Sequence, residues 1–379
     1  MSTRLILTFD GLATASLGCY GSTWCRTPAI DAIAAEGTVI DRCVASHDTA
    51  ADAIAEIAAE WIQAAATGII GHQTFLVTDD DDVADAAGEH FDQVVTVPLD
   101  DTSSEPAFDM DQTHLATLIA AAADTENSAA RSTRSDGRQS KDAVIWVHSR
   151  VLTTIWDAPR TPIAESDESF MPSEPSEEDG FGDVDADTID ADKIEALPNE
   201  FDDVDPPNLR LAADDHIDTA LVWTQTYALQ VQLIDLMIEI LLSSLSDPDP
   251  RVLVASTGGF VLGQNDYVGR FAGPPHSQQL GLAAIISDTP PSRISGLTRL
   301  TDIVDIWTKV LLNQTPSPSA ADHVETRTDR AKRCLTTPSW FWTRDAEGQD
   351  RLFLKPADAH DVNDVARLRI DVIDDLETL

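Results

Sequence analysis

Short apolar runs alternate with helical patterns along the chain. Read in order, the runs are LILTF (5–9), TFLVT (74–78), VVTVP (94–98), AVIWVH (143–148), RVLVAS (251–256) and LAAIIS (282–287). Uninterrupted apolar strands that alternate with helices are typical of a sheet covered on both faces. The pattern therefore predicts an α/β fold in which a large, mainly parallel central sheet is flanked by helices.

The segments between these runs carry helical periodicity. Residues 48–67 repeat apolar positions at three- and four-residue spacing and end at Gly68, and residues 28–37 form a shorter helix after Thr27. The longest apolar stretch, residues 227–245, contains four polar or acidic positions, among them Asp235. A membrane span needs about 20 residues nearly free of such groups, so we predict a buried amphipathic helix in a soluble, cytoplasmic protein.

Charge narrows the range of partners. The 379 residues include 66 acids and 25 bases, a formal charge of −41. Nucleic acids and anionic membranes require a basic face, so neither is an expected partner. The simplest interpretation of the acidity is solubility or adaptation to a salty cytoplasm. The four cysteines show neither zinc-ligand spacing nor a disulfide pattern.

Two polar stretches suggest the domain organisation. Residues 160–207 are dense in Asp, Glu, Ser and Pro and have little to bury, which predicts a long mobile insertion. From Asp183 onward the insertion resembles the start of a calcium-binding loop, but it lacks the Gly and the Glu that such a loop requires. We therefore expect no calcium site there. A second stretch, QTPSPSAAD (314–322), divides a main domain (1–315) from a C-terminal subdomain (316–379).

Several motifs resemble the sulfatase family of the alkaline phosphatase superfamily, in the family's order. The first fifty residues have the family's strand ending in Asp10, its LGCYG turn and its TP-helix-EG segment. Similar segments follow at residues 146–159, 251–287, 292–311 and 351–376. The resemblance implies an alkaline-phosphatase/sulfatase-like fold with a small C-terminal subdomain.

The resemblance also implies which residues should bind a divalent cation. Sulfatases hold calcium or a similar ion with an Asp pair on the first strand and an Asp-His or Asp-Asn pair on a later one. Here Asp10 matches the first acid, but Gly11, Thr257 and Gly258 stand at the other positions. A hard cation needs roughly 6 to 8 oxygen ligands. We therefore expect Asp10 to be an insufficient remnant of a metal site and expect no cofactor.

The nucleophile motif of the family, C/S-x-P-S-R, is missing as well. Thr49 lies near the corresponding position, but Ala53 or Ile54 replaces the arginine. A threonine hydroxyl is a weak nucleophile without a cation or base beside it. The simpler role for Thr49, or for Asp48, is to cap the helix that follows.

Two further positions match substrate-binding residues of the family. His148 corresponds to a histidine common among relatives, and Arg270 keeps the positive charge of a lysine. A lone histidine at a strand end is more often structural, and Thr153 replaces another family histidine.

The leading hypothesis is a catalytically degenerate sulfatase-like protein with a binding or regulatory role. One alternative is an active sulfate or phosphate ester hydrolase with calcium or magnesium, using Asp10, Thr49 and rearranged acids such as Asp48 and Asp52. That alternative requires at least three carboxylates at the sheet rim, whereas degeneracy predicts a rim that is apolar or filled by small residues. Another alternative is docking of a basic protein partner by the acidic insertion, which deletion of residues 165–205 would abolish.

Overall fold

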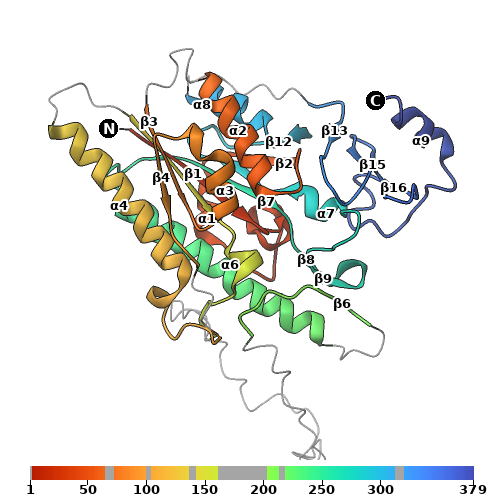
Figure 1. The fold of residues 1–379 in the computed structure, drawn as a ribbon, viewed down its shortest axis with the longest axis horizontal. Helices are drawn as coiled ribbons and strands as arrows, with labels where there is room; N and C mark the ends of the chain where they lie inside the picture. Colours follow the sequence, from red (N-terminus) through yellow and green to blue (C-terminus); the bar gives the residue numbers. More distant parts are fainter. Residues whose placement is uncertain are drawn as a thin grey trace, which may run out of the picture.

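A nine-stranded sheet forms the centre of the protein (Figure 1). The computed structural model describes residues 2–64, 72–99, 104–135, 142–160, 203–212, 218–311 and 320–379. Along the sheet the order is β10-β2-β11-β7-β1-β5-β3-β4, with β12 paired to β2. The strands are β1 (Thr3–Asp10), β2 (Thr38–Val44), β3 (His72–Thr78), β4 (Gln93–Thr96), β5 (Asp142–Ser149), β7 (Arg251–Gly258), β10 (Gly281–Leu282), β11 (Ala284–Ile286) and β12 (Ser292–Arg299).

Strand β1 lies in the middle of the sheet and is buried along its whole length. It pairs in parallel with β5 on one side and β7 on the other, and β5 pairs in parallel with β3. Leu5 and Leu7 pack on one face, whereas Ile6 between them packs on the other. This alternation explains why the strand is apolar at consecutive positions.

Helices cover both faces of the sheet (Figure 1). One face packs against α1 (Pro28–Ala35), α4 (His114–Ser135) and α6 (Thr219–Ser244), and the other against α2 (Ala50–Ala64), α3 (Asp81–Ala87) and α8 (Asp302–Leu311). Two single-turn helices, α5 (Val151–Thr154) and α7 (Ser277–Leu280), lie in connections. The predicted fold class, with its two-sided sheet, is confirmed.

Helix α6 is the apolar segment predicted to be buried and amphipathic. By length and composition it could cross a membrane, but 61% of its most apolar window is buried inside the protein. Such burial is usual for the core helix of a globular domain. Tyr227 and Ile234 of this helix are completely buried against the sheet.

Two small sheets complete the described fold. An antiparallel sheet near the C-terminus contains β13 (Val324–Glu325), β14 (Arg333–Thr336), β15 (Trp340–Arg344) and β16 (Asp350–Leu354), and helix α9 (Ile370–Leu376) packs on it. The other contains β6 (Leu209–Arg210), β8 (Val261–Leu262) and β9 (Tyr267–Gly269). The predicted boundary at residues 315/316, and all but the ends of the acidic insertion, lie outside the described residues.

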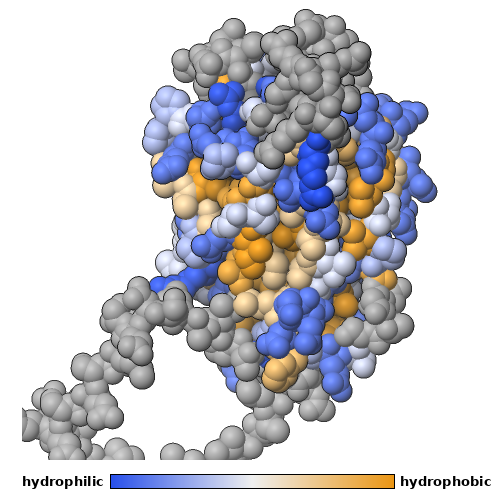
Figure 2. Space-filling view, turned by 90° about the vertical axis from the view of Figure 1, so that its left-hand side faces the viewer, coloured by the Kyte–Doolittle hydropathy of each residue, from blue (hydrophilic) through white to orange (hydrophobic). Residues whose placement is uncertain are grey.

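Strand β4 forms one edge of the central sheet, and apolar side chains lie at the surface on this side of the molecule (Figure 2). A groove between β4 and α4 is lined by Phe75, Val95, Ala121 and Ala129, among others. The strand is only four residues long, and its end residues are exposed and polar. A short polar edge offers little backbone for pairing with another chain.

Candidate functional site

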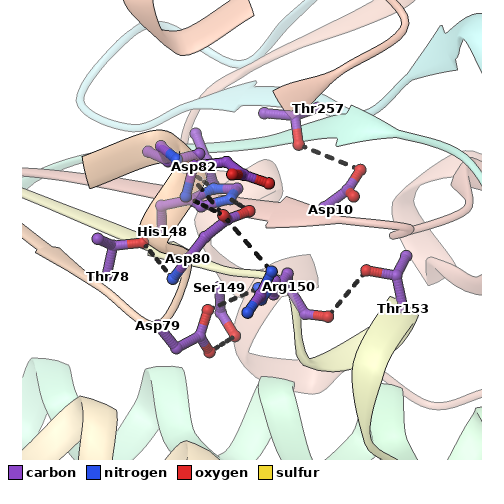
Figure 3. Close-up of polar contacts among 12 residues, drawn as sticks. Asp10, Thr78, Asp79, Asp80, Asp82, His148, Ser149, Arg150, Thr153 and Thr257 are labelled. Carbon is purple, nitrogen blue, oxygen red and sulfur yellow. Dashed lines mark hydrogen bonds and ion pairs between the residues drawn. The ribbon is translucent and has the colours of Figure 1, made fainter. Parts of the chain in front are cut away.

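The carboxyl ends of four neighbouring strands bring polar side chains together (Figure 3). Strand β1 ends at Asp10, and β7 ends at Gly258, its partner in register. Asp79 and Asp80 follow β3, and Arg150 follows β5. Ligand sites in open α/β sheets lie at this rim, where strands pass into loops.

Asp10 is engaged by an arginine. Its carboxylate Oδ2 lies 2.6 Å from Nη1 of Arg270, and only 5% of the residue is exposed. Arg270 follows β9, and its Nη2 also donates to the backbone oxygen of Asp48 at 3.2 Å. The structure therefore brings together Asp10, considered for the metal, and Arg270, considered for the substrate, and the charge of one neutralises the other.

The surroundings of Asp10 do not fit a divalent cation. Gly11 has a φ of +86°, and a Cβ there would lie 2.8 Å from Cγ2 of Thr153. A Cβ on Gly258 would lie 2.6 Å from Oδ1 of Asp10. Thr257 contributes only a hydroxyl, 3.5 Å from the same oxygen. Within the described ranges no three His, Cys, Asp or Glu side chains are grouped so that they could hold a metal.

A residue of the C-terminal region completes this side of the rim. Arg330 donates from Nε to Oδ2 of Asp48 at 2.7 Å and from Nη1 to the backbone oxygen of Phe271 at 2.5 Å. Thr328 also donates to Asp48. Arg330 could not be recognised from the sequence, because no motif links it to Asp48, from which 282 positions separate it.

Thr49 is the cap of helix α2. Its hydroxyl donates to Oδ2 of Asp52 at 2.7 Å and accepts from the Asp52 backbone N–H at 3.3 Å. Acceptance from the N–H of the third helical residue is the bond that an N-cap side chain makes. In the structure Thr49 thus has the simpler of the two roles considered for it, that of a cap on the helix that follows.

Asp80 occupies the rim between β3 and α3. It caps α3 by accepting from the N–H groups of Asp82 at 3.0 Å and Val83 at 3.4 Å. Burial opposes ionisation of this carboxyl, but His148 and Arg150 outweigh it and hold the pKa of Asp80 below its usual value. Asp80 is therefore ionised at neutral pH.

His148 does not reach the cavity. It is completely buried, with Nδ1 3.0 Å from the Thr8 hydroxyl and Nε2 3.8 Å from Oδ2 of Asp80. The sequence analysis expected a substrate-binding residue. The structure instead places His148 behind Asp80, because both faces of β5 are covered and side chains within the strand are buried at consecutive positions.

Asp79, next to Asp80, fixes the end of β5. It is 2% exposed and accepts from the Ser149 hydroxyl at 2.6 Å and from the Arg150 backbone N–H at 2.9 Å. His114 of α4 lies 3.4 Å away. Asp79 is therefore a buried anchor for the loop that carries Arg150.

These side chains surround an open cavity of about 510 Å³ at the rim, which we call the rim cavity. Its charged lining comprises four carboxylates and three guanidiniums: Asp10, Asp48, Asp80, Asp82, Arg150, Arg270 and Arg330. Degeneracy predicted a rim that is apolar or filled by small residues. The charged lining of the rim cavity does not agree with that prediction. The carboxylates that an active enzyme requires are present, but three of them face arginines.

Comparisons with solved structures agree with this arrangement of elements. Over its whole length the chain superposes on 95% of a phosphonate monoester hydrolase from Agrobacterium radiobacter, with a TM-score of 0.66 and 13% identity. It covers 90% of a putative sulfatase from Bacteroides thetaiotaomicron at a TM-score of 0.66 and 12% identity. The chain has a sulfatase-like fold.

A third similar structure is a protein in complex with its substrate D-glucosamine-2-N,6-O-disulfate, at a TM-score of 0.62 and 15% identity over all of this chain and 97% of the other. A scan of family models and a search of curated proteins find no match. At such low identities the sulfatase-like fold is established, whereas the chemistry has to be argued from the rim cavity itself.

Proposed function

We propose that this sulfatase-like protein binds a ligand in the rim cavity and does not cleave sulfate, phosphate or phosphonate esters. The observation that carries the proposal is the ion pair between Asp10 and Arg270 at 2.6 Å. The guanidinium occupies one side of the carboxylate that would have to coordinate an ion. The bulk of Thr153 and the proximity of Gly258 to Asp10 leave no room for further acids.

The lack of an activated nucleophile supports the same proposal. The Thr49 hydroxyl is directed to Asp52, an acceptor that is itself used in the helix cap. Asp48, the other acid considered for a rearranged site, is bonded to Arg330 and Thr328. Asp52 is the carboxylate beside the Thr49 hydroxyl, but a carboxylate is a weak base for an alcohol and forms little alkoxide without a cation to lower the pKa of the hydroxyl.

Calorimetric titration with Ca²⁺ and Mg²⁺ tests the proposal, using the full-length protein and Asp10→Ala. We expect any binding to be the same in both proteins, because surface acids would be responsible. Asp288→Ala, which removes an exposed acid paired with Arg251, is the matched control. Micromolar or tighter binding that is lost only in Asp10→Ala would contradict the proposal and favour the hydrolase alternative.

A screen of sulfate, phosphate and phosphonate esters provides the second test. We expect no turnover above the rate of the Asp10→Ala protein. Turnover that requires Asp10 would overturn the proposal even if no cation is bound.

A further inference from the structure

A second cavity lies where the C-terminal region meets the main part of the protein, and we call it the junction cavity. Its volume is about 530 Å³, and the described residues that line it are all different from those of the rim cavity. Trp24 and Leu282 line it from the main part, and Thr336, Lys355 and His360 line it from the C-terminal region. A volume of this size is typical of a site for a small molecule.

The walls of the junction cavity are held in place by hydrogen bonds. Arg42 of β2 donates from Nη1 to the backbone oxygen of Pro338 at 2.9 Å and from Nη2 to that of Thr337 at 3.2 Å. Ser277, which also lines the cavity, bonds Asp361 through its backbone N–H and its hydroxyl. A ligand therefore meets a cavity that is already formed, which lowers the entropic cost of binding.

One part of the lining is suited to a flat apolar group. Trp24 is 40% exposed, so part of its indole is accessible. The same cavity is lined by Val44, Leu262 and Leu282. An indole contacts another aromatic ring by stacking or through its edge, and the aliphatic side chains add apolar surface. These groups favour a ligand with an aromatic body.

The charged residues of the lining leave one charge without a counter-charge. They are Asp41, Arg42 and Lys355. Asp41 pairs with Arg293 at 2.5 Å, and Lys355 pairs with Asp361 at 2.5 Å. Among the described residues no carboxylate pairs with Arg42, whose two bonds go to backbone oxygens. The lining thus carries one net positive charge, although the whole chain has 66 acids and only 25 bases.

Partial burial makes the charge of Arg42 costly without an anion. The residue is half-buried, and burial lowers the pKa of its guanidinium. A guanidinium has five N–H donors, and the backbone oxygens that accept from two of them bring no negative charge. The remaining donors are suited to a carboxylate, because the two oxygens of a carboxylate match the planar arrangement of the N–H groups.

We infer that the junction cavity binds an aromatic monocarboxylate, with its ring against Trp24 and its carboxylate on Arg42. The one net positive charge of the lining limits the ligand to a single negative charge. The inference goes beyond the proposed function, since it concerns a cavity separate from the rim cavity.

Titration calorimetry with indole-3-carboxylate and with the uncharged indole-3-carboxamide tests the inference on the full-length protein at neutral pH. The two compounds have nearly the same shape and differ in charge. We expect the carboxylate to bind roughly 10- to 100-fold more tightly, the factor for one or two charge-assisted hydrogen bonds. In Arg42→Gln this preference should fall to about threefold or less. Arg299→Gln, which removes an arginine bonded to the backbone oxygen of His323 outside the cavity, is the control and should keep the preference.

The contact with Trp24 is tested by Trp24→Ala. This variant should bind the carboxylate roughly tenfold more weakly, because the ring contact is lost. Phe108→Ala, which removes an aromatic ring that is 83% exposed outside the cavity, is the control and should bind as the wild type does. Circular dichroism and thermal unfolding establish that each variant is folded.

Two results with the wild type alone would overturn the inference, namely no binding of the carboxylate or equal binding of the carboxamide. Unchanged binding by Trp24→Ala would overturn it as well. Binding that is lost in Asp10→Ala would place the ligand in the rim cavity and would contradict the assignment to the junction cavity.

Discussion

At the residue scale, the charged groups at the rim are nearly all used by one another. Asp10 pairs with Arg270, Asp48 with Arg330, and Asp52 with Thr49. The two arginines neutralise Asp10 and Asp48, so neither carboxylate is available to bind a cation, and without a cation the Asp52 carboxylate is a weak base for the Thr49 hydroxyl. Arg150 remains available because its own partner, Asp80, serves mainly as a helix cap.

The role of Thr49 leads to a prediction about stability. Thr49→Ala should lower the free energy of unfolding by about 1 kcal/mol, because an N-cap side chain is lost, whereas Thr49→Ser should change it little. Urea unfolding followed by circular dichroism measures both. If Thr49→Ala instead lost an ester-cleaving activity of the wild type and kept its stability, Thr49 would have a catalytic role.

At the element scale, a buried carboxylate joins two helices that lie far apart in the sequence, α6 and α1. Asp235 of α6 accepts from the N–H groups of Ala29 at 3.1 Å and Ile30 at 2.8 Å and so caps α1 from the side. Burial raises the pKa of Asp235 to about 6, despite these bonds. The carboxyl is therefore less readily ionised in the folded protein than in the unfolded chain.

This shift predicts a pH dependence that can be assigned to one residue. A raised pKa in the folded state contributes stability that is present at low pH and is lost as the pH rises through about 6. Between about pH 5 and about pH 8, wild type should lose roughly 1 to 2 kcal/mol relative to Asp235→Asn, which cannot titrate. Urea unfolding of both proteins at the two pH values measures the difference. An unchanged difference would show that Asp235 titrates normally.

At the scale of the whole molecule, the C-terminal region is part of the candidate site. This region supplies Arg330 to the rim cavity. A second contact, between Asp361 and Ser277, also joins the C-terminal region to the main part of the protein. Asp361 is buried, with 4% of the residue exposed. Its carboxylate accepts from the backbone N–H of Ser277 at 2.6 Å, from the Ser277 hydroxyl at 2.8 Å and from Nζ of Lys355 at 2.5 Å. Burial opposes ionisation, but His276 and Lys355 outweigh it and lower the pKa of Asp361.

Breaking that contact should loosen the C-terminal region. Asp361→Ala leaves the buried Lys355 without its carboxylate and should cost roughly 3 kcal/mol of stability, as expected for breaking a buried ion pair. Limited proteolysis should then cut the C-terminal region earlier than in the wild type. Asp371→Asn, which removes an exposed pair with Arg369, is the control and should leave the cleavage pattern unchanged. Equal protection of Asp361→Ala would show that other contacts hold this region.

The alternation of apolar strands and amphipathic helices in the sequence determined the fold class, because burial on both faces imposes a pattern that is local in the chain. The strand ending at Asp10 and the helix cap at Thr49 could be recognised for the same reason: each depends on residues only a few positions apart. The strand-end rule also applies to Arg150, which directly follows an apolar run, although the sequence analysis passed over it.

Only the tertiary structure decided what these groups do. Asp10 and Arg270 are 260 positions apart, and Asp48 and Arg330 are 282 apart. Neither pairing leaves a periodic trace in the sequence, since the order of strands in the sheet brings the partners together. Burial of His148 behind Asp80 likewise follows from the helices that pack on both faces of β5. Some residues of the rim could thus be identified from the sequence. Which acid pairs with which arginine is decided by the tertiary structure.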